Sequence, residues 1–312
     1  NNSDETITKK VKVDLPRLSH KSFILSEIFN KSLNGGVIKI QQPQQSLFYG
    51  RMFWGIKNTK TNSFSANHSY YSSTEVQEYF DIDSCYRTYP YFKNFSNKVV
   101  IYPIMSPSEI YFQIKITTDD KIFYSKEKII ISPSGQEEEF DINEIVNYNK
   151  LENITAFTLI GKTKNKKIPS RVNHQVIYGS RDPLIKIKAS INTSMSNKKM
   201  FFPQNKEKII WGQIICDTSF TSKLGFVFMD PDGNQDIIDI DIYNEEGFVK
   251  NIKKMLKPSN SVQISHADIK ETSSRKDLKF YWYTAKSSRQ DLTAFSFHCN
   301  NETGESSGEH SF

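Results

Sequence analysis

Apolar and polar residues alternate along much of this chain, and a period of two predicts β-strands. The segment "DIIDIDIY" places Ile238, Ile240 and Ile242 at alternate positions, so these side chains share one face of a strand. Asp239 and Asp241 fall on the other face, which predicts one buried face and one wet face. Further runs of this kind are "VVIYPI", "IYFQIKIT", "KIFYS", "KIIIS", "ITAFTLIG", "IIWGQIIC", "LGFVFMD", "LKFYWYTA" and "LTAFSFHC". They predict a mainly all-β fold.

Two segments predict short helices instead of strands. The first is "SHKSFILSEIFNKSL", residues 19–33, and the second is "NEEGFVKNIKKMLKP", residues 244–258. In the second segment, apolar residues from Phe248 to Leu256 recur at spacings of three and four, and Pro258 would end the helix. Each helix is expected to connect strands.

A second pattern is a series of similar segments in the two halves of the chain. "NITAFTLIGKTK", residues 153–164, resembles "DLTAFSFHCNNE", residues 291–302. Three more pairs occur in the same order: "GGVIKIQQ" (35–42) with "DPLIKIKA" (182–189), "RMFWG" (51–55) with "KMFFP" (199–203), and "SEIYFQIKITTDD" (108–120) with "SKLGFVFMDPDGN" (222–234). We therefore expect two tandem β-sandwich domains, jelly-roll or immunoglobulin-like, related by internal duplication, with Phe157 and Phe295 at equivalent buried positions.

The length of 312 residues suits two domains of about 150 residues each. The repeats place domain 1 at residues 1–165, with an aromatic-rich insertion at 57–98, and domain 2 at residues 183–303. We expect residues 166–182 to form a solvated linker and residues 304–312 to form a polar tail.

Composition and the chain ends bear on the compartment. The aromatic content of 13% suits strands and polar loops rather than helices. The net charge of +6 permits anionic partners but is too low for a dedicated nucleic-acid-binding protein. No apolar run approaches the ~18 residues of a membrane span. The start, "NNSDETITKK", resembles a mature chain after removal of a signal peptide, or a cloned fragment, and the polar end suits a stem leading to a membrane anchor outside this chain.

Glycosylation sequons also favour secretion. The candidate N-glycosylation sites are Asn30, Asn67, Asn94, Asn153, Asn192 and Asn301. The alternative is a cytosolic or bacterial protein from an AT-rich genome, in which abundant Asn makes such triplets meaningless. We expect a secreted protein or one on the extracellular face of the plasma membrane.

The cysteines extend this argument. Cys216 lies on an early strand of the second half and Cys299 on its last strand, and neither has a counterpart in the first half. A disulfide between them is expected in an oxidising compartment, and the alternative is two buried reduced thiols. Cys85 would remain, either bonded to another molecule or buried and inert.

No sequence motif indicates catalysis. The histidines are scattered, and the chain contains no zinc-binding, phosphate-binding or nucleophile-elbow motif, so we expect no enzyme activity, no cofactor and no metal. Oxygen-bearing side chains alternate in one segment as they do in a calcium loop: Asp230, Asp232, Asn234 and Asp236. Gly233 is misplaced for that motif, so a hairpin turn is the favoured interpretation.

The aromatic-rich insertion is the first candidate binding site. Exposed tyrosines are typical of recognition surfaces for proteins and sugars, because the ring is large and rigid and has a polar tip. The candidate residues are Tyr70, Tyr71, Tyr79, Tyr86, Tyr89 and Tyr91. The alternative is that these rings belong to the core of the first domain.

A lysine row is the second candidate site. Its members would lie on one face of the second predicted helix: Lys250, Lys253, Lys254 and Lys257. There they would attract a polyanion such as a sulfated glycan or a nucleic acid. The alternative is the wet side of an ordinary amphipathic helix.

These patterns together favour a non-enzymatic recognition or adhesion protein, secreted or on the cell surface, that binds a protein or a glycan on a cell surface. The second hypothesis is a protein that binds nucleic acid or another polyanion through its lysines. The third is a carbohydrate-active enzyme whose site is assembled from distant loops. The sequence leaves the oligomeric state open.

Overall fold

The computed structural model of the chain describes residues 9–16, 19–30, 38, 53–68, 79–80, 82–101, 109–130, 138–169, 172–197, 207–269 and 279–311. The chain divides into two compact units, residues 1–41 and residues 42–312. In the first unit, helix α1 (Leu25–Phe29) ends at Asn30, whose backbone is left-handed with φ of 54°. This confirms a helix within residues 19–33, although it is only five residues long.

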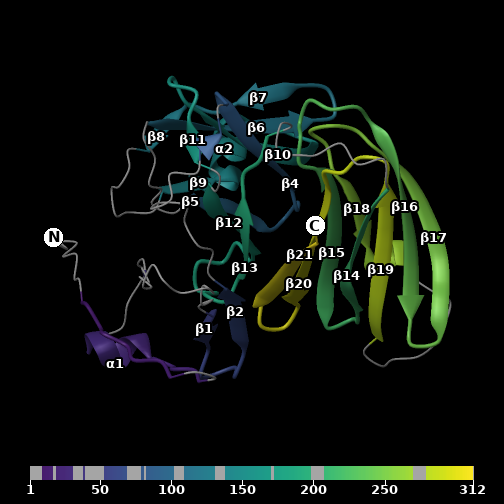
Figure 1. The fold of residues 1–312 in the computed structure, drawn as a ribbon. Coiled ribbons are helices and arrows are strands. Elements are labelled where there is room, and N and C mark those ends of the chain that lie inside the picture. The colour runs from purple at the N-terminus through teal and green to yellow at the C-terminus, as the bar shows by residue number, and fades with distance from the viewer. Residues whose placement is uncertain are drawn as a thin grey trace. The chain divides into compact units, whose positions relative to one another are not determined.

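The second unit consists mainly of antiparallel β-strands (Figure 1). Its first half contains β1 (Phe53–Lys57), β2 (Phe64–His68), β3 (Tyr79–Phe80), β4 (Ser84–Pro90), β5 (Ser96–Ile101), β6 (Ile110–Thr118), β7 (Ile122–Tyr124), β8 (Lys128–Ile130), β9 (Glu138–Asp141), α2 (Ile142–Tyr148), β10 (Ile154–Lys162), β11 (Ile168–Pro169), β12 (Asn173–Gly179) and β13 (Ala189–Ser194). Its second half contains β14 (Lys208–Cys216), β15 (Phe220–Phe228), β16 (Asp236–Asn244), β17 (Gly247–Leu256), β18 (Val262–Ser265), α3 (His266–Ile269), β19 (Lys279–Ser287), β20 (Leu292–Asn300) and β21 (Ser306–Ser311). None of the described helices exceeds seven residues, and none can cross a membrane.

Two large sheets form in each half of this unit, as far as the structure describes it. Sheet 1 has the order β4-β10-β6-β7, with β8 also paired to β6, and sheet 2 has the order β13-β12-β5-β9. Sheet 3 has the order β14-β19-β16-β17, and sheet 4 has the order β18-β15-β20-β21. All their strand pairs are antiparallel, which confirms the predicted all-β fold.

The two halves have the same strand order. Sheet 3 matches sheet 1 and sheet 4 matches sheet 2 when β14 is equated with β4, β15 with β5 and β19 with β10. Positions along the chain agree as well: β4 and β14 begin at residues 84 and 208, β5 and β15 at 96 and 220, and α2 and α3 at 142 and 266, so each pair is 124 residues apart. Duplication of one β-sandwich would produce this topology, although a common origin of the halves stays a prediction.

The particular segments from which we predicted duplication are not equivalent. Residues 153–164 contain β10 and residues 291–302 contain β20, yet β10 corresponds to β19, and β20 corresponds to β12. The prediction that Phe157 and Phe295 occupy equivalent positions is therefore wrong, although both rings are fully buried. The segments look alike because β10 and β20 are both interior strands, which favour the same aromatic and β-branched residues.

The predicted domain limits also change. β12 lies inside sheet 2, between β13 and β5, so residues 166–182 are not a linker. β21 occupies most of residues 304–312, which were predicted to be a tail. The predicted insertion at 57–98 contains β4, whose counterpart is β14, so only part of it is unmatched. Along the chain, the boundary between the two halves lies instead between the end of β13 and the start of β14.

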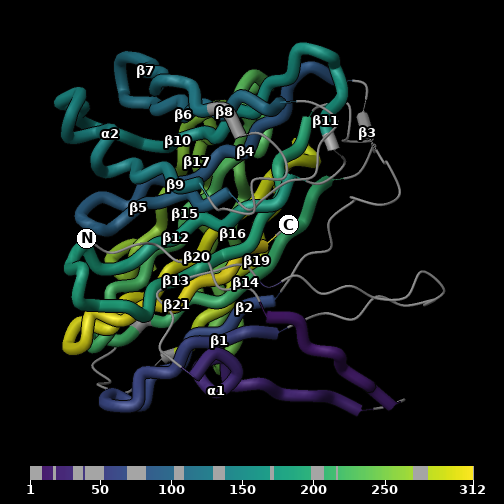
Figure 2. Tube along the Cα trace, turned by 90° about the vertical axis from the view of Figure 1, so that its left-hand side faces the viewer, coloured from purple at the N-terminus to yellow at the C-terminus, as the bar shows by residue number. Residues whose placement is uncertain are grey.

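Sheet 4 is the central layer of the second unit. Residues 292–299 of β20 are all buried, so both faces of this sheet are covered. On one face, Phe226 packs against Tyr283 of sheet 3, with ring centroids 5.4 Å apart. On the other face, Phe295 and Phe297 join the core of the first half. Figure 1 shows sheet 4 between sheet 3 and the first half, and Figure 2 shows β13 and β21 side by side at the edges of sheets 2 and 4.

Candidate binding surface

The predicted tyrosine site is not a surface where the structure describes it. Tyr86, Tyr89 and Tyr91 are at most 7% exposed, so the alternative interpretation, a role in the core, is correct for these rings. The physical reason is that β4 is covered on both faces by the rest of the fold. Outside the described residues lie Tyr70, Tyr71 and the side chain of Tyr79.

Tyr89 belongs to a buried polar network instead of a recognition loop. Its ring packs between Phe157 and Phe295, with centroid distances of 5.3 and 5.2 Å. Its hydroxyl group is hydrogen-bonded to His174 Nε2 and to Thr193 Oγ1. Burial lowers the pKa of His174 to about 3, so the imidazole stays neutral. This network is sealed from solvent, and its role is structural.

The predicted lysine row is wrong, because its residues lie on and just after β17 and not on a helix. β17 is the edge strand of sheet 3, and alternation along it separates the lysines. Lys253 Nζ lies 3.2 Å from Asp239 on the outer face. Lys250 and Lys254 pair with the buried isoleucines of β16 and therefore share their inner face, and Lys257 follows the strand. Inward lysines on an edge strand hinder pairing with other sheets.

The predicted disulfide between Cys216 and Cys299 is absent, because Cys299 is a free, buried thiol. Cys299 shares a face of β20 with Phe297, and this face points toward the core of the first half, away from sheet 3, which contains Cys216. Cys85 is also buried, and burial raises the pKa of its thiol to about 12. The alternative of a buried, inert thiol is therefore correct for Cys85.

The sequons differ in their access to solvent. Four are exposed: Asn30, Asn94, Asn153 and Asn301. Asn67 is half-buried, and Asn192 is only 2% exposed. The Asn192 amide nitrogen donates to Asn67 Oδ1 at 3.0 Å and to the carbonyl oxygen of His68. Because a glycan would be attached to that nitrogen, the prediction of glycosylation at Asn192 is wrong for the folded chain.

The acidic segment between β15 and β16 contains a turn, as predicted, but it is not a hairpin turn, because β15 lies in sheet 4 and β16 in sheet 3. The guanidinium group of Arg289 donates to the backbone oxygens of Asp230, at 3.3 Å, and of Asn234, and to the carboxylate of Asp291 at 2.6 Å. The cation that stabilises this loop is thus the side chain of Arg289. Within the described ranges, no group of His, Cys, Asp and Glu is arranged to bind a metal ion.

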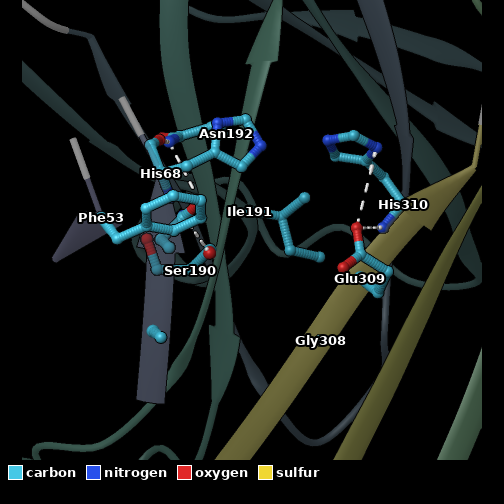
Figure 3. Close-up of a pocket in the computed structure, with 10 residues that line it drawn as sticks. Phe53, His68, Ser190, Ile191, Asn192, Gly308, Glu309 and His310 are labelled. Atoms are coloured by element: carbon cyan, nitrogen blue, oxygen red, sulfur yellow. Dashed lines mark hydrogen bonds and ion pairs between the residues drawn. The ribbon is translucent and has the colours of Figure 1, made fainter. Parts of the chain in front are cut away.

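A small cavity lies between the β1–β2 hairpin, β13 and β21 (Figure 3). Its volume of about 190 Å³ is below the ~300 Å³ of the smallest usual ligand pockets. Asn67 Nδ2 donates to the Ser190 carbonyl oxygen, and Asn192 donates to the hairpin. Burial lowers the pKa of His310 to about 4, so this imidazole is neutral. These polar groups attach the hairpin to β13, which makes the cavity a structural junction.

The outer face of sheet 3 is the candidate binding surface. Ile238, Ile240 and Ile242 of β16 are fully buried on the inner face, as their alternation predicts, so the intervening side chains point outward. Trp211 is 73% exposed, Phe248 61% and Trp282 41%. Contiguous exposed apolar side chains are rare on monomeric soluble proteins and mark interaction sites.

In the strand register, three rows of outward side chains cross all four strands of sheet 3. The aromatic row is Phe248, Tyr243, Trp282 and Gln213. The polar row is Asn251, Asp241, Thr284 and Trp211. The charged row is Lys253, Asp239, Lys286 and Ile209. We call these three rows together the sheet 3 face.

The aromatic row is continuous across three strands. The Tyr243 ring is nearly parallel to the Trp282 ring, with an interplanar angle of 10° and centroids 6.2 Å apart. It meets the Phe248 ring edge-on, at 74° and 5.9 Å. These contacts hold the rings in a fixed arrangement while leaving Phe248 and Trp282 exposed, so the row is organised before any partner binds.

Hydrogen-bonding groups lie directly beside the rings. Asn251 Nδ2 donates to Asp241 Oδ1 at 2.8 Å and also to Asp239. The hydrogen bond from Asn251 lowers the pKa of Asp239, which is therefore ionised at neutral pH. A carboxylate accepts several hydrogen bonds, so both aspartates retain capacity for a ligand. The face combines apolar rings with donors and acceptors, which equips it for binding.

Sequence reasoning found the wet side of β16 but missed the aromatic row beside it. No protein-family model, curated protein or solved structure matches this chain.

Proposed function

We propose that this chain is a non-enzymatic recognition protein whose sheet 3 face binds a protein or a glycan partner. The observation that carries the proposal is the row of fixed, solvent-exposed aromatic rings beside Trp211. Tryptophan and tyrosine are enriched among the residues that dominate binding energies.

The exposed rings lie outside the buried core of the sandwich. On β19 the inward side chains Tyr281 and Tyr283 are at most 3% exposed and supply the contacts to sheet 4. Phe280 and Trp282 alternate with them and are 48% and 41% exposed. Burial of apolar surface stabilises by about 25 cal/mol per Å². The exposed rings would gain this stabilisation when a bound partner covers them.

The proposal of a secreted or cell-surface location is supported by the exposed sequons, such as Asn94 and Asn153. Glycans on these residues, found by mass spectrometry of protein from its natural source, would support it. The hypothesis of polyanion binding depended on a helix, but the structure has strand β17 at those residues. Lys253 is instead beside Asp239, so the described lysines do not favour that alternative.

The proposal is tested by binding of the labelled protein to the surface of cells from its own source. The double variant Trp211→Ala, Trp282→Ala should bind at least tenfold more weakly than the wild type, because each anchoring ring contributes about 1–3 kcal/mol. Tyr148→Ala is the matched control, since Tyr148 is 87% exposed but lies on α2 in the other half. Equal binding by the double variant and the wild type would contradict the proposal.

A further inference from the structure

We infer that the occupant of the sheet 3 face is a neutral oligosaccharide chain. This inference rests on the proposed function and narrows the partner from a protein or a glycan to a glycan without charged groups. It follows from the side chains that surround the aromatic row.

Charged groups lie in the middle of the face, where a protein partner would have to desolvate them. Asp239 and Asp241 are on β16, which is flanked by β17 on one side and β19 on the other. The centres of protein interfaces are depleted in Asp and Lys, because burying such charges is unfavourable unless each is paired. Sugar hydroxyl groups reduce that cost, since they replace water by donating to carboxylates and accepting from ammonium groups.

The charges on the face balance one another. Two carboxylates, Asp239 and Asp241, stand among two ammonium groups, Lys253 and Lys286. Lys253 Nζ lies 3.2 Å from Asp239 Oδ2, so part of the positive charge is already paired within the face. Carboxylates at the centre would repel sulfate or uronate groups, so electrostatic complementarity favours a neutral ligand.

The spacing of the rows also suits a sugar chain. A sugar ring has apolar C–H faces as well as hydroxyl groups, so it requires aromatic and hydrogen-bonding side chains close together. Neighbouring rows are two residues apart along β14, β16 and β19, which is about 7 Å, and a register shift on β17 places Phe248 three residues from Asn251. A sugar unit on Tyr243 and Trp282 therefore reaches Asp241, Asn251 and Thr284 with its hydroxyl groups.

The test uses linear hexasaccharides of glucose, xylose, mannose and N-acetylglucosamine, with a heparin hexasaccharide as the charged comparison. Titration is followed by tryptophan fluorescence, since two of the three tryptophans lie on the face. At least one neutral chain should bind with a Kd below about 1 mM, and this Kd should change less than about twofold between low and high salt. Trp282→Ala and Asp241→Ala should each weaken binding at least tenfold, while Tyr148→Ala should bind as the wild type does.

Binding of heparin alone, with a steep salt dependence, would overturn the inference. So would cell binding that requires Trp282 but survives enzymatic removal of surface glycans and is lost after proteolysis. In that case the recognition function stands and only the glycan is wrong. Cell binding that is unchanged in Trp282→Ala would instead refute the proposed site itself, and the inference with it.

Discussion

Sheets 1 and 3 have matching strand orders in the two halves, but their outer faces differ in chemistry and in exposure. The outer face of sheet 1 carries Thr88, Thr158 and Lys115, all at most 5% exposed. The outer face of sheet 3 carries Trp211 and Trp282, which are 73% and 41% exposed. The face of sheet 1 is polar and covered at these positions, although Tyr124 and Lys162 on the same face are each 50% exposed, whereas the face of sheet 3 exposes aromatic rings.

Loops of the second half cover sheet 1. Thr88 Oγ1 donates to the carbonyl oxygen of Met229 at 3.3 Å, and Lys115 Nζ donates to Ser259 Oγ at 2.8 Å. Burial lowers the pKa of Lys115, and Asp232, whose carboxylate lies 3.9 Å away, opposes this shift. The buried side chains of Thr88 and Lys115 thus each meet a partner from the covering loops.

The difference shows that strand order does not decide which sheet is exposed. The covered face has the side chains that a fixed intramolecular contact requires, namely hydroxyl groups and an ammonium group with defined acceptors. The uncovered face has exposed rings that no described part of this unit packs over. That contrast, within one topology, is the strongest argument for a binding role of sheet 3.

The largest expected effect concerns Tyr89, whose ring lies on the inner face of sheet 1 in the core. Tyr89→Ala should lower the free energy of unfolding by about 3–5 kcal/mol, because it leaves a cavity in the core and removes the hydrogen bonds to His174 and Thr193. Urea unfolding followed by circular dichroism measures this. A loss below about 1 kcal/mol would show that Tyr89 is not in a packed core.

Acid should also destabilise the fold, because His174 of sheet 2 and His298 of sheet 4 are buried. The unfolded chain takes up a proton at His174 near pH 6.5, but burial lowers the folded-state pKa to about 3. The contribution of neutral His174 to the unfolding free energy is therefore fully present above pH 6.5. It declines as the pH falls toward 3, by about 1.4 kcal/mol per pH unit. Burial lowers the pKa of His298 to about 4 and adds to the effect.

Unfolding free energies at pH 7 and pH 5 check this expectation, with a loss of about 2 kcal/mol from His174 alone. His174→Gln, which does not titrate, should show a smaller loss between the two pH values. Stability that is constant or higher at pH 5 would contradict the burial of a neutral imidazole. Binding at the sheet 3 face should persist at pH 5, because the pKa of Asp239 is lowered.

A smaller effect is expected at the contact between sheet 1 and the loops of the second half. Lys115→Met should lower the unfolding free energy by about 1.5 kcal/mol, because it removes the charged hydrogen bond to Ser259. Lys162→Met is the matched control on the same sheet, since Lys162 is 50% exposed and 4.0 Å from Glu127, and it should change stability by less than about 0.5 kcal/mol. Equal losses in the two variants would mean that the outer face of sheet 1 is not covered.

Alternation predicted strands well where one face is apolar and the other polar. In β16 the buried isoleucines and the outward aspartates follow the sequence pattern directly. In β17 the same logic failed, because Lys250 and Lys254 occupy inward positions at a sheet edge, and the remaining apolar residues fall at helical spacing. A polar residue on the inner face of a strand interrupts the apolar–polar alternation from which strands are predicted.

The candidate site could not be predicted because aromatic residues occur on both faces. In "LKFYWYTA" four successive rings alternate between core and solvent, and their chemistry does not show which is which. The pairing of Asp241 with Thr284 and of Tyr243 with Trp282 assigns the faces, and this register is a tertiary property. The tyrosines of β4 were misassigned for the same reason.

The most direct test of the central claim measures stability and binding on one variant, Trp282→Ala. If the sheet 3 face serves binding and not folding, the unfolding free energy should change by no more than about 1 kcal/mol, the contribution of the lost ring pair with Tyr243, while binding to cells weakens at least tenfold. A loss of about 2 kcal/mol or more in stability, or undiminished binding, would contradict the account.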